Sequence, residues 1–422
     1  DNAYSLSTGG PFGARMTEEN GSPTNPNMIT PRSYHYKMHL EKDSLFYRLR
    51  SGQSDQTDRW FWRRIDESDS MVLNIPLPDY DPSSTDSVTL RIQFHGYSSL
   101  DMPGPDHWAL IVLNGNLVLA ANGDQIQWYR QTPYLFDAKI DPSYVVAGNN
   151  RLVLKHGPLD TLDSYFLNWI GIEYPRLYSA SGGSINFNSP VDMADSLLRF
   201  TVNGFEDQAI EVYKIGVSKI VGAQIERDPA GMNYQLSFDD KSSLPSRYFA
   251  VQDDGQHKLK PKAIIKNHAP SPALTDNTQA AEYIIIASDS LRNEALRLAS
   301  QRSLQYNGVK VISVTDIFDA FNFGIPQDKA IRDFLGYAYS SWQSPPSFVL
   351  LLGGGSWDPR NLLGHSRADF VPVHLTRTDN FGPVADDNYY SCLAGNDILP
   401  DIAVGRVPVS TAEDYRMWEA KQ

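Results

Sequence analysis

The feature that most constrains the fold is an alternation of short apolar runs with helical segments in the last third of the chain. Three runs have the length and apolar character of buried strands: Tyr283–Ala287, Val309–Val314 and Phe348–Leu352. Two segments between them predict helices: Arg292–Tyr306, with Gly308 just beyond its end, and Asp328–Ser340. Strands that alternate with helices form crossover units and therefore a parallel sheet. We predict a parallel α/β domain in this part of the chain.

A glycine-rich loop follows the third strand, and parallel sheets bind ligands at this end of their strands. The loop runs from Gly353 through Gly354, Gly355, Ser356, Trp357 and Asp358. It lacks the Lys-Ser/Thr pair of a phosphate loop and the G-x-G-x-x-G of a dinucleotide site. A nucleophile elbow needs glycine where the chain has Asp358. The pattern favours a tight turn that lets another backbone or a substrate approach closely.

The first two thirds of the chain show the pattern of a β-sandwich. Ser87–Phe94 alternates, with Val88, Leu90 and Phe94 on one face. Asn114-Gly115 predicts a hairpin, because both central positions of such a turn need positive φ. Several short strands at this spacing predict a sandwich or jelly roll.

A chain of 422 residues exceeds the size of one core, so we expect several domains. The predicted organisation is an irregular leader at 1–30, a jelly-roll-like β-sandwich at 31–180, a second small β unit at 181–265, a linker at 266–279 and a truncated α/β subdomain at 280–422.

Charge and composition exclude several classes of function. The net charge is −13, from 50 acidic and 37 basic residues, which argues against a nucleic-acid partner. No apolar run is long enough for a transmembrane segment, and this chain shows no signal peptide. A single cysteine rules out a disulfide framework.

Cys392 is the only thiol and must be considered as a nucleophile. A catalytic cysteine needs a nearby base and surroundings that favour the thiolate. Asp386 and Asp387 disfavour the thiolate, while His365 and His374 lie in an apparent loop and a Pro-flanked segment. We interpret Cys392 as a half-buried structural cysteine.

Acidic residues cluster after residue 378 among glycines and asparagines. Asp386, Asp387 and Asp397, with Asp379 and Asp401, are candidate oxygen ligands for Ca²⁺. The spacing is not that of an EF-hand, so solvated turn residues are the alternative. Paired carboxylates for glycoside chemistry cannot be supported from spacing alone.

The chain ends shortly after a helix begins. Asp401–Val409 predicts a short strand that ends at Gly405-Arg406, and Ser410 and Glu413 behind it have the spacing of a capping box. The helix then runs through Trp418 without a stop signal. We expect the natural polypeptide to continue, and the start at Asp1 without methionine fits a processed or truncated product.

Five segments of the last third form a recognisable set: Glu282–Asp289, Asp328–Leu335, Val349–Asn361, Asp386–Tyr390 and Pro400–Val409. Together they resemble the peptidase C25 (gingipain-like) family of secreted bacterial cysteine proteases. Their order and spacing are more specific than any one of them, and they cover about residues 280–422. The β-rich region, with Asn168–Arg176, more loosely resembles the module that often precedes this domain.

The resemblance implies a caspase-like α/β fold of two side-by-side subdomains, a protein or peptide substrate and a secreted or cell-surface location in bacteria. Its Cys/His dyad would lie after Gln422, so this chain would hold only the first subdomain and be inactive alone. The family also includes the type IX secretion sortase, for which outer-membrane secretion components would be partners.

Two other functions stay open at this point. One is a carbohydrate- or protein-binding module with a degenerate, non-catalytic α/β domain. The other is a different hydrolase that uses Ser356 or the acidic cluster.

Overall fold

The computed structural model describes residues 16–421, apart from residues 25, 27, 48–57, 100–102, 121–122, 124, 158–162, 230, 242–244, 254–273, 365–368 and 379–380. The described residues form two compact units. One contains residues from 16 to 46 and from 60 to 253, and the other contains residues from 274 to 421. The predicted multidomain arrangement, with β modules ahead of a parallel α/β sheet, is confirmed.

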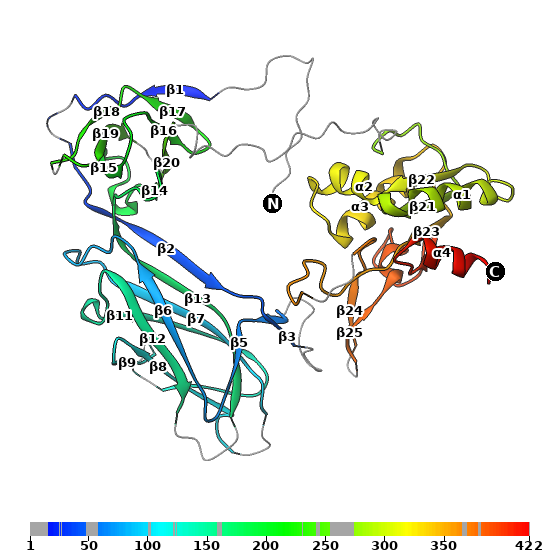
Figure 1. Cartoon of the computed structure of the whole chain (residues 1–422), viewed down its shortest axis with the longest axis horizontal. Coiled ribbons are helices and arrows are strands. Elements are labelled where there is room, and N and C mark those ends of the chain that lie inside the picture. The colour runs from blue at the N-terminus through cyan, green and yellow to red at the C-terminus, as the bar shows by residue number, and fades with distance from the viewer. Residues whose placement is uncertain are drawn as a thin grey trace. The chain divides into compact units, whose positions relative to one another are not determined.

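The first unit contains a sandwich of two antiparallel sheets (Figure 1). One sheet has the order β10 (Ile126–Trp128), β8 (His107–Leu113), β12 (Gly148–His156) and β6 (Ser70–Leu77), with β9 (Asn116–Val118) paired to β8. The other has the order β11 (Pro133–Ile140), β7 (Val88–Gly96), β13 (Ser164–Leu177) and β2 (Ser33–Glu41), with β5 (Arg63–Asp66) paired to β13. A two-stranded ribbon joins β3 (Leu45–Phe46) and β4 (Trp60–Phe61).

The alternation in the sequence explains the core of this sandwich. Val88, Leu90 and Phe94 of β7 are buried, as predicted, against Ile111 of β8. Asn114 and Gly115 have φ of 49° and 89° and connect β8 to β9 in a hairpin. Strands with one apolar face therefore meet face to face and exclude water between the two sheets.

Further strands form a second β region in the same unit. One sheet contains β1 (Thr17–Asn20), β17 (Ser218–Val221), β16 (Ile210–Lys214), β20 (Arg247–Gln252) and β14 (Ser184–Asn188) in that order. The other contains β15 (Leu197–Phe205), β19 (Tyr234–Lys241) and β18 (Gln224–Arg227).

Two segments differ from the predicted organisation. Thr17–Asn20, inside the predicted irregular leader, pairs with β17 because its backbone fills the free edge of that strand. Leu274, inside the predicted linker, is buried in the core of the second unit, and its carbonyl accepts a hydrogen bond from Trp342 Nε1 (3.1 Å). Strand β2 also contributes to both β cores, since Tyr34 lies in the second core and Tyr36 packs against both.

The second unit is built on a parallel sheet with the order β22 (Val309–Ser313), β21 (Tyr283–Ala287), β23 (Phe348–Leu352) and β26 (Ala403–Val407). Helices α1 (Arg292–Arg302) and α4 (Ala412–Glu419) pack on one face, and α2 (Val314–Asn322) and α3 (Asp328–Ser341) pack on the other. A short hairpin pairs β24 (Leu375–Thr378) with β25 (Gly382–Ala385). Short 3₁₀ helices precede α1 and follow β25: η3 (Asp289–Leu291) and η4 (Asp387–Tyr390).

Helix α2 was not predicted. Val314, predicted as the last residue of a strand, instead begins the helix, because Ser313 accepts a hydrogen bond from the N–H of Thr315 and caps it. Helix α1 ends at Arg302, four residues before the predicted Tyr306, and a series of turns leads to Gly308 at φ 78°.

The cap of α4 is also displaced by one residue. Thr411, not Ser410, accepts the N–H of Asp414 (3.0 Å), and Asp414, not Glu413, accepts the N–H of Ser410 (3.3 Å). The displacement follows from the start of the helix at Ala412, which makes Thr411 the first non-helical residue.

We expect Thr411→Ala to lower the free energy of unfolding of the α/β unit by about 1 kcal/mol, because an N–H at the helix start loses its acceptor. Ser410→Ala is the matched control and should have little effect, since its hydroxyl does not cap the helix. Amide hydrogen exchange of the first turn of α4 measures both. Equal losses in the two variants would contradict the assigned cap.

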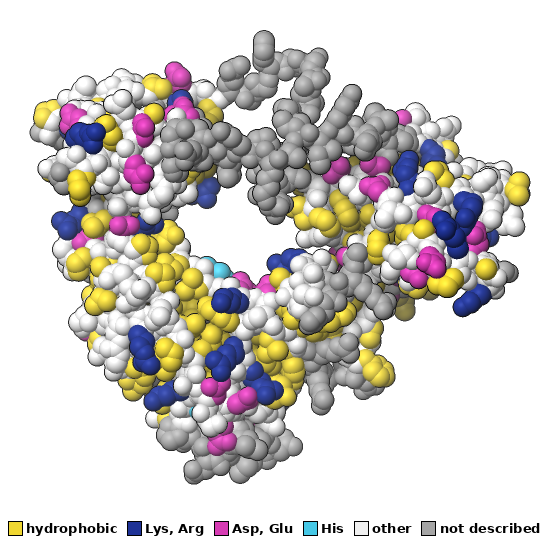
Figure 2. Space-filling view, in the orientation of Figure 1, with side chains coloured by type: hydrophobic (Ala, Val, Ile, Leu, Met, Phe, Trp, Pro, Cys, Tyr) yellow, Lys and Arg dark blue, Asp and Glu magenta, His cyan; other side chains and the backbone are white. Residues whose placement is uncertain are grey.

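No helix among the described residues is both long and apolar enough to cross a membrane. Acidic and basic side chains lie interspersed on the face shown in Figure 2.

Candidate functional site

The carboxyl ends of the four parallel strands define the candidate site. Because the strands are in register, the residues after Ala287, Ser313, Leu352 and Val407 meet at one edge of the sheet. Three segments converge there: the glycine-rich loop 353–358, the crossing segment 369–373 and the segment 386–390 at η4. Ligands of parallel sheets bind at this edge.

The glycine-rich loop is crossed closely by another part of the chain. A Cβ on Gly353, whose φ is 145°, would lie 2.8 Å from Phe370 Cβ, and one on Gly355 would lie 2.8 Å from Val373 Cβ. The carbonyl of Gly354 accepts the N–H of Phe370 (3.0 Å). The backbone that approaches these glycines is therefore the crossing segment 369–373.

The polar residues of this loop hold its own turn. The N–H of Ser356 donates to Asp369 Oδ1 (2.8 Å), and Ser356 Oγ accepts the N–H of Asp358 (3.1 Å). Asp358 is buried, and its two oxygens accept the N–H groups of Leu362 (2.9 Å) and Leu363 (3.0 Å). None of these contacts places a base beside the hydroxyl of Ser356. The side chain of Trp357, the next residue, is 44% exposed.

Asp369 has a perturbed carboxyl group. Burial raises its pKa, while the N–H of Ser356 and the charge of Arg406 act in the opposite direction without overcoming burial. A half-buried carboxyl with a raised pKa is a feature of functional sites.

Arg406 holds the converging segments together. Its Nε and Nη2 donate to the two oxygens of Asp387 (both 2.8 Å). Nη1 donates to the carbonyls of Gly353 (2.9 Å) and Val371 (2.8 Å), and Nη2 also donates to the carbonyl of Pro372 (3.0 Å). All five N–H groups of the guanidinium are thus used. The side chain is 10% exposed, so we interpret it as a structural support of this edge.

A histidine–carboxylate pair lies at the same edge. His374 Nδ1 lies 2.7 Å from Asp328 Oδ2 at the start of α3, and the imidazole stacks on Tyr389 at 3.6 Å between ring centroids. The guanidinium of Arg332 covers the Tyr389 ring (4.6 Å). An aspartate on Nδ1 orients an imidazole with its other nitrogen outward. Both side chains are about one third exposed, at 30% and 32%.

Cys392 is not paired with a base in the part of the chain that the structure describes. Its Sγ accepts from Asn388 Nδ2 (3.4 Å) and lies 3.9 Å from Ser391 Oγ. Its exposure is intermediate. His374 is engaged with Asp328, and His365 lies outside the described residues.

The predicted calcium ligands are engaged in other contacts. Asp387 is paired with Arg406, Asp386 accepts the Thr376 hydroxyl (2.8 Å), and Asp397 accepts the N–H of Leu399 (3.0 Å). Between residues 274 and 421, outside the gaps, no three acidic, histidine or cysteine side chains are placed to hold a metal. Asp379 lies outside the described residues. The geometry thus gives no support to the calcium hypothesis.

Backbone hydrogen bonds account for another member of the acidic cluster. Asp401 Oδ2 accepts the N–H groups of Leu393 (2.7 Å) and Ala394 (2.8 Å), which lower its pKa. Asp401 therefore holds a turn.

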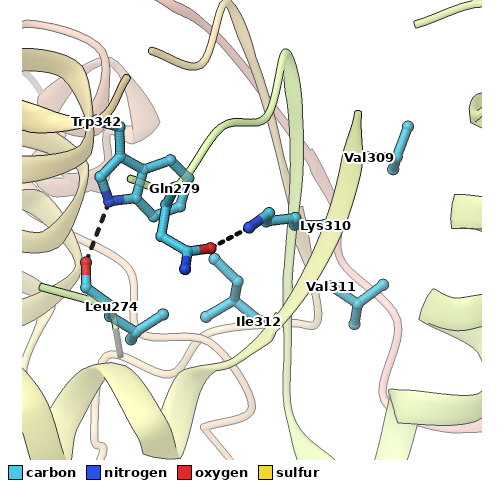
Figure 3. Close-up of a pocket in the computed structure, with 7 residues that line it drawn as sticks. All are labelled: Leu274, Gln279, Val309, Lys310, Val311, Ile312 and Trp342. Atoms are coloured by element: carbon cyan, nitrogen blue, oxygen red, sulfur yellow. Dashed lines mark hydrogen bonds between the residues drawn. The ribbon is translucent and has the colours of Figure 1, made fainter. Parts of the chain in front are cut away.

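A cavity of about 240 Å³ lies beside the edge strand β22 (Figure 3). Lys310 Nζ donates to Gln279 Oε1 across it, and its charge lies 5.5 Å from the Trp342 ring. The volume is below the range of roughly 300–1,000 Å³ usual for ligand sites. Its lining residues are separate from those of the carboxyl edge.

Arg406, Asp369 and the His374–Asp328 pair were not predicted from the sequence as parts of one site. One signal was present: Arg406 ends a predicted strand, and polar side chains at parallel strand ends converge. The partners could not be read from the sequence, since Asp328 and His374 are 46 residues apart.

Comparison with known proteins gives a family match for the second unit. Residues 276–421 match the family model of Peptidase family C25. The resemblance seen in the sequence is thereby confirmed for this segment. No curated protein matches the chain.

Among solved structures, the chain is similar to dimeric latent PorU from Porphyromonas gingivalis, with 17% identity and a TM-score of 0.67. The match covers 96% of this chain and 39% of that chain, so the chain spans less than half of that protein's length. At this identity the likeness shows the fold.

Two further structures match weakly. A carbohydrate-binding module, CBM36 in complex with calcium and xylotriose, has 12% identity and a TM-score of 0.21 over 32% of this chain and 98% of that module. The ANX2 ectodomain from Arabidopsis thaliana has 9% identity and a TM-score of 0.20 over 53% of this chain and 84% of that one. Scores this low carry no argument about ligand or function.

Proposed function

We propose that this chain is the amino-terminal part of a secreted, gingipain-like cysteine endopeptidase, whose Cys/His dyad is supplied by residues beyond 422. The observation that carries the proposal is the match of residues 276–421 to Peptidase family C25. The similarity in fold over 96% of the chain supports it for the β modules as well.

The geometry of the carboxyl edge supports a scaffolding role for this chain. The guanidinium of Arg406 donates to Asp387 and to three carbonyls, and the carboxylate of Asp358 in the glycine-rich loop accepts backbone N–H groups. No thiol–imidazole contact occurs among the described residues. In the full enzyme, a thiolate would attack the peptide carbonyl, a histidine would act as base, and backbone amides would stabilise the oxyanion. This chain would hold one side of that site in place.

The finer assignments belong to the same proposal. The α/β unit would be the first of two subdomains of a caspase-like fold, and the protein would act outside the bacterial cell or at its surface on protein or peptide substrates. A sortase of type IX secretion, with outer-membrane secretion components as partners, is the branch of the family that the PorU-like fold favours.

The test compares the chain of residues 1–422 with a longer protein that adds about 150 residues of its own reading frame, the size of a missing half-domain. Both are incubated with denatured casein and with a fluorogenic peptide mixture. We expect no hydrolysis by the shorter chain and hydrolysis by the longer one that iodoacetamide abolishes. Cys392→Ser in the longer protein is the control and should leave activity intact.

Two outcomes would contradict the proposal. Hydrolysis by residues 1–422 that is lost in Cys392→Ser would move the nucleophile into this chain. A continuation without a histidine and a cysteine would remove the peptidase assignment altogether.

A further inference from the structure

Two histidines and an aspartate form a buried cluster at one end of the β-sandwich, far in sequence from the α/β unit. They are His107 in β8, His156 in β12 and Asp163 just before β13, with side chains 0%, 5% and 1% exposed. The histidines belong to one sheet and Asp163 leads into the other. The cluster therefore joins the two sheets.

Both nitrogens of His107 face oxygen atoms that can only accept. Nδ1 lies 2.7 Å from Asp163 Oδ1, and Nε2 lies 3.0 Å from the carbonyl of Arg130. A neutral imidazole carries one N–H and one lone pair. One of the two contacts would then set a lone pair against an oxygen, so the doubly protonated ring fits this site.

His156 has the same arrangement. Nδ1 lies 2.8 Å from Asp163 Oδ2, and Nε2 lies 3.1 Å from the carbonyl of Ile65 in β5. Asp163 Oδ2 also accepts the N–H of Trp108 (3.0 Å). Asp163 thus receives three donors, which requires its ionised form.

The pKa of Asp163 is lowered, in agreement with an ionised carboxylate. Burial by itself raises this pKa, but hydrogen bonds from His107, His156 and the Trp108 N–H outweigh burial and lower it. Tyr165 packs its ring 4.5 Å from His156, and burial raises the pKa of its phenol, so it stays neutral beside the cluster.

The surrounding chain is shaped to admit these contacts. A Cβ on Gly96 would lie 2.3 Å from His107 Nε2 and 2.1 Å from the Arg130 carbonyl oxygen, so only glycine leaves room for this hydrogen bond. Trp128 covers the His107 ring at 4.8 Å. The cluster is a built site and not a chance approach of side chains.

Two further carboxylates lie next to the cluster, and one of them, Asp66, is also paired with Arg64 (2.9 Å). Asp106, beside His107, is 5% exposed and accepts the N–H of Arg130 (2.6 Å). Asp66 in β5 accepts the hydroxyl of Ser164 (2.8 Å). Burial raises the pKa of Asp66, but Ser164, Arg64 and the charge of His156 together lower it.

We propose that His107, Asp163 and His156 form a pH-sensitive clasp, in which two imidazolium rings on one carboxylate hold the sheets together and release this end of the sandwich when they lose protons.

The direction of the effect follows from proton binding. Histidines ordinarily titrate near pH 6.5 and aspartates near 3.9, as approximate values. In the proposed clasp each ring keeps both N–H protons hydrogen-bonded to its acceptor oxygens, whereas the unfolded chain loses one from each ring as pH rises through the ordinary histidine range, so stability falls as pH rises. The lowered pKa of Asp163 adds stability above the ordinary aspartate range, and this part is lost in acid. The clasp is strongest between these limits.

The test measures amide exchange of β8 and β12 in the whole chain between pH 5.5 and 8.5, corrected for intrinsic exchange. Two released protons predict that protection falls up to about 100-fold per pH unit above the histidine range, and one released proton predicts about tenfold. We therefore expect the steeper fall in the natural chain and the shallower fall in His156→Gln. His39→Gln is the matched control, because its pair with Glu41 lies on the exposed face of the same sandwich (55% and 36% exposed).

A second measurement keeps the test decisive if a variant does not fold. Nitrogen chemical shifts of ¹⁵N-histidine in the natural chain distinguish imidazolium from the neutral tautomers. Two buried imidazoles protonated on both nitrogens at pH 6 are expected. Neutral tautomers at that pH, or protection of β8 and β12 that does not change with pH, would overturn the clasp.

Discussion

Replacing Arg406 by alanine is expected to destabilise the α/β unit by about 3–5 kcal/mol, since one partner of a largely buried ion pair is lost. The substitution leaves Asp387 without its bidentate partner and removes the donor from three carbonyls. The loops at the carboxyl edge would then separate from the sheet. Arg406→Lys should recover little, because an ammonium cannot reproduce the planar fork of five donors.

Amide exchange resolved to β23 and β26 measures this loss, and the strands of the β-sandwich serve as an internal reference. Lys329→Ala is the matched control. Its pair with Asp333 (2.7 Å) is exposed, at 67% for Lys329 and 40% for Asp333, so the loss should stay below about 0.5 kcal/mol. If Arg406→Ala costs no more than Lys329→Ala, Arg406 does not support this edge.

Gly355→Ala is expected to destabilise the same unit by about 1–3 kcal/mol, the usual cost of overpacking. The new methyl group would lie 2.8 Å from Val373 Cβ and 3.0 Å from the Val373 backbone nitrogen. Neither atom is the end of a flexible side chain, so the crossing segment 369–373 must move. The contact between Ser356 N–H and Asp369 (2.8 Å) would loosen with it.

Gly354→Ala provides a control one residue away. The nearest atom to its added Cβ is 3.8 Å distant, which is ordinary contact. Alanine there should be neutral or stabilise by up to about 1 kcal/mol, because it reduces the freedom of the unfolded chain. Thermal unfolding and exchange of residues 370–373 compare the two variants. Equal effects at both positions would show that the crossing segment does not depend on the missing side chain of Gly355.

Activity measurements on these variants distinguish residues that support the site from residues that take part in catalysis. In the longer protein that carries the proposed dyad, Gly355→Ala and Arg406→Ala should reduce hydrolysis, whereas Gly354→Ala should not. Both effects would come through the positions of the loops, since the guanidinium of Arg406 already uses all its N–H groups and Gly355 has no side chain.

Strands were predicted best where side-chain period and burial agree. Tyr283–Ala287 and Phe348–Leu352 were predicted with the bounds that the structure shows, because both are uniformly apolar runs in the middle of a sheet. The error came at α2, where Val314 and Thr315 continue the β-branched run of β22. The side chain of Ser313 caps the helix there and so favours helix over strand. A single capping hydrogen bond of this kind is hard to recognise from the sequence.

The candidate site could be predicted only in outline. The sequence places a glycine-rich loop at a strand end, and that much of the site is local. It does not show that Arg406 pairs with Asp387, 19 residues away, or that His374 pairs with Asp328. It also does not show that His107 and His156 share Asp163. His107 and Asp163 are 56 residues apart in the sequence.

The sequence by itself determined the main strands of the last third, two of its helices and the parallel arrangement of its sheet, but not α2. These features follow from periodicity and spacing, which act over a few residues at a time. Its motifs also resemble those of one family. The tertiary structure alone decided which charged side chains are satisfied and which atoms a glycine must leave room for. Those depend on distances between segments that only the folded chain brings together, and a shift of one ångström makes or breaks each contact.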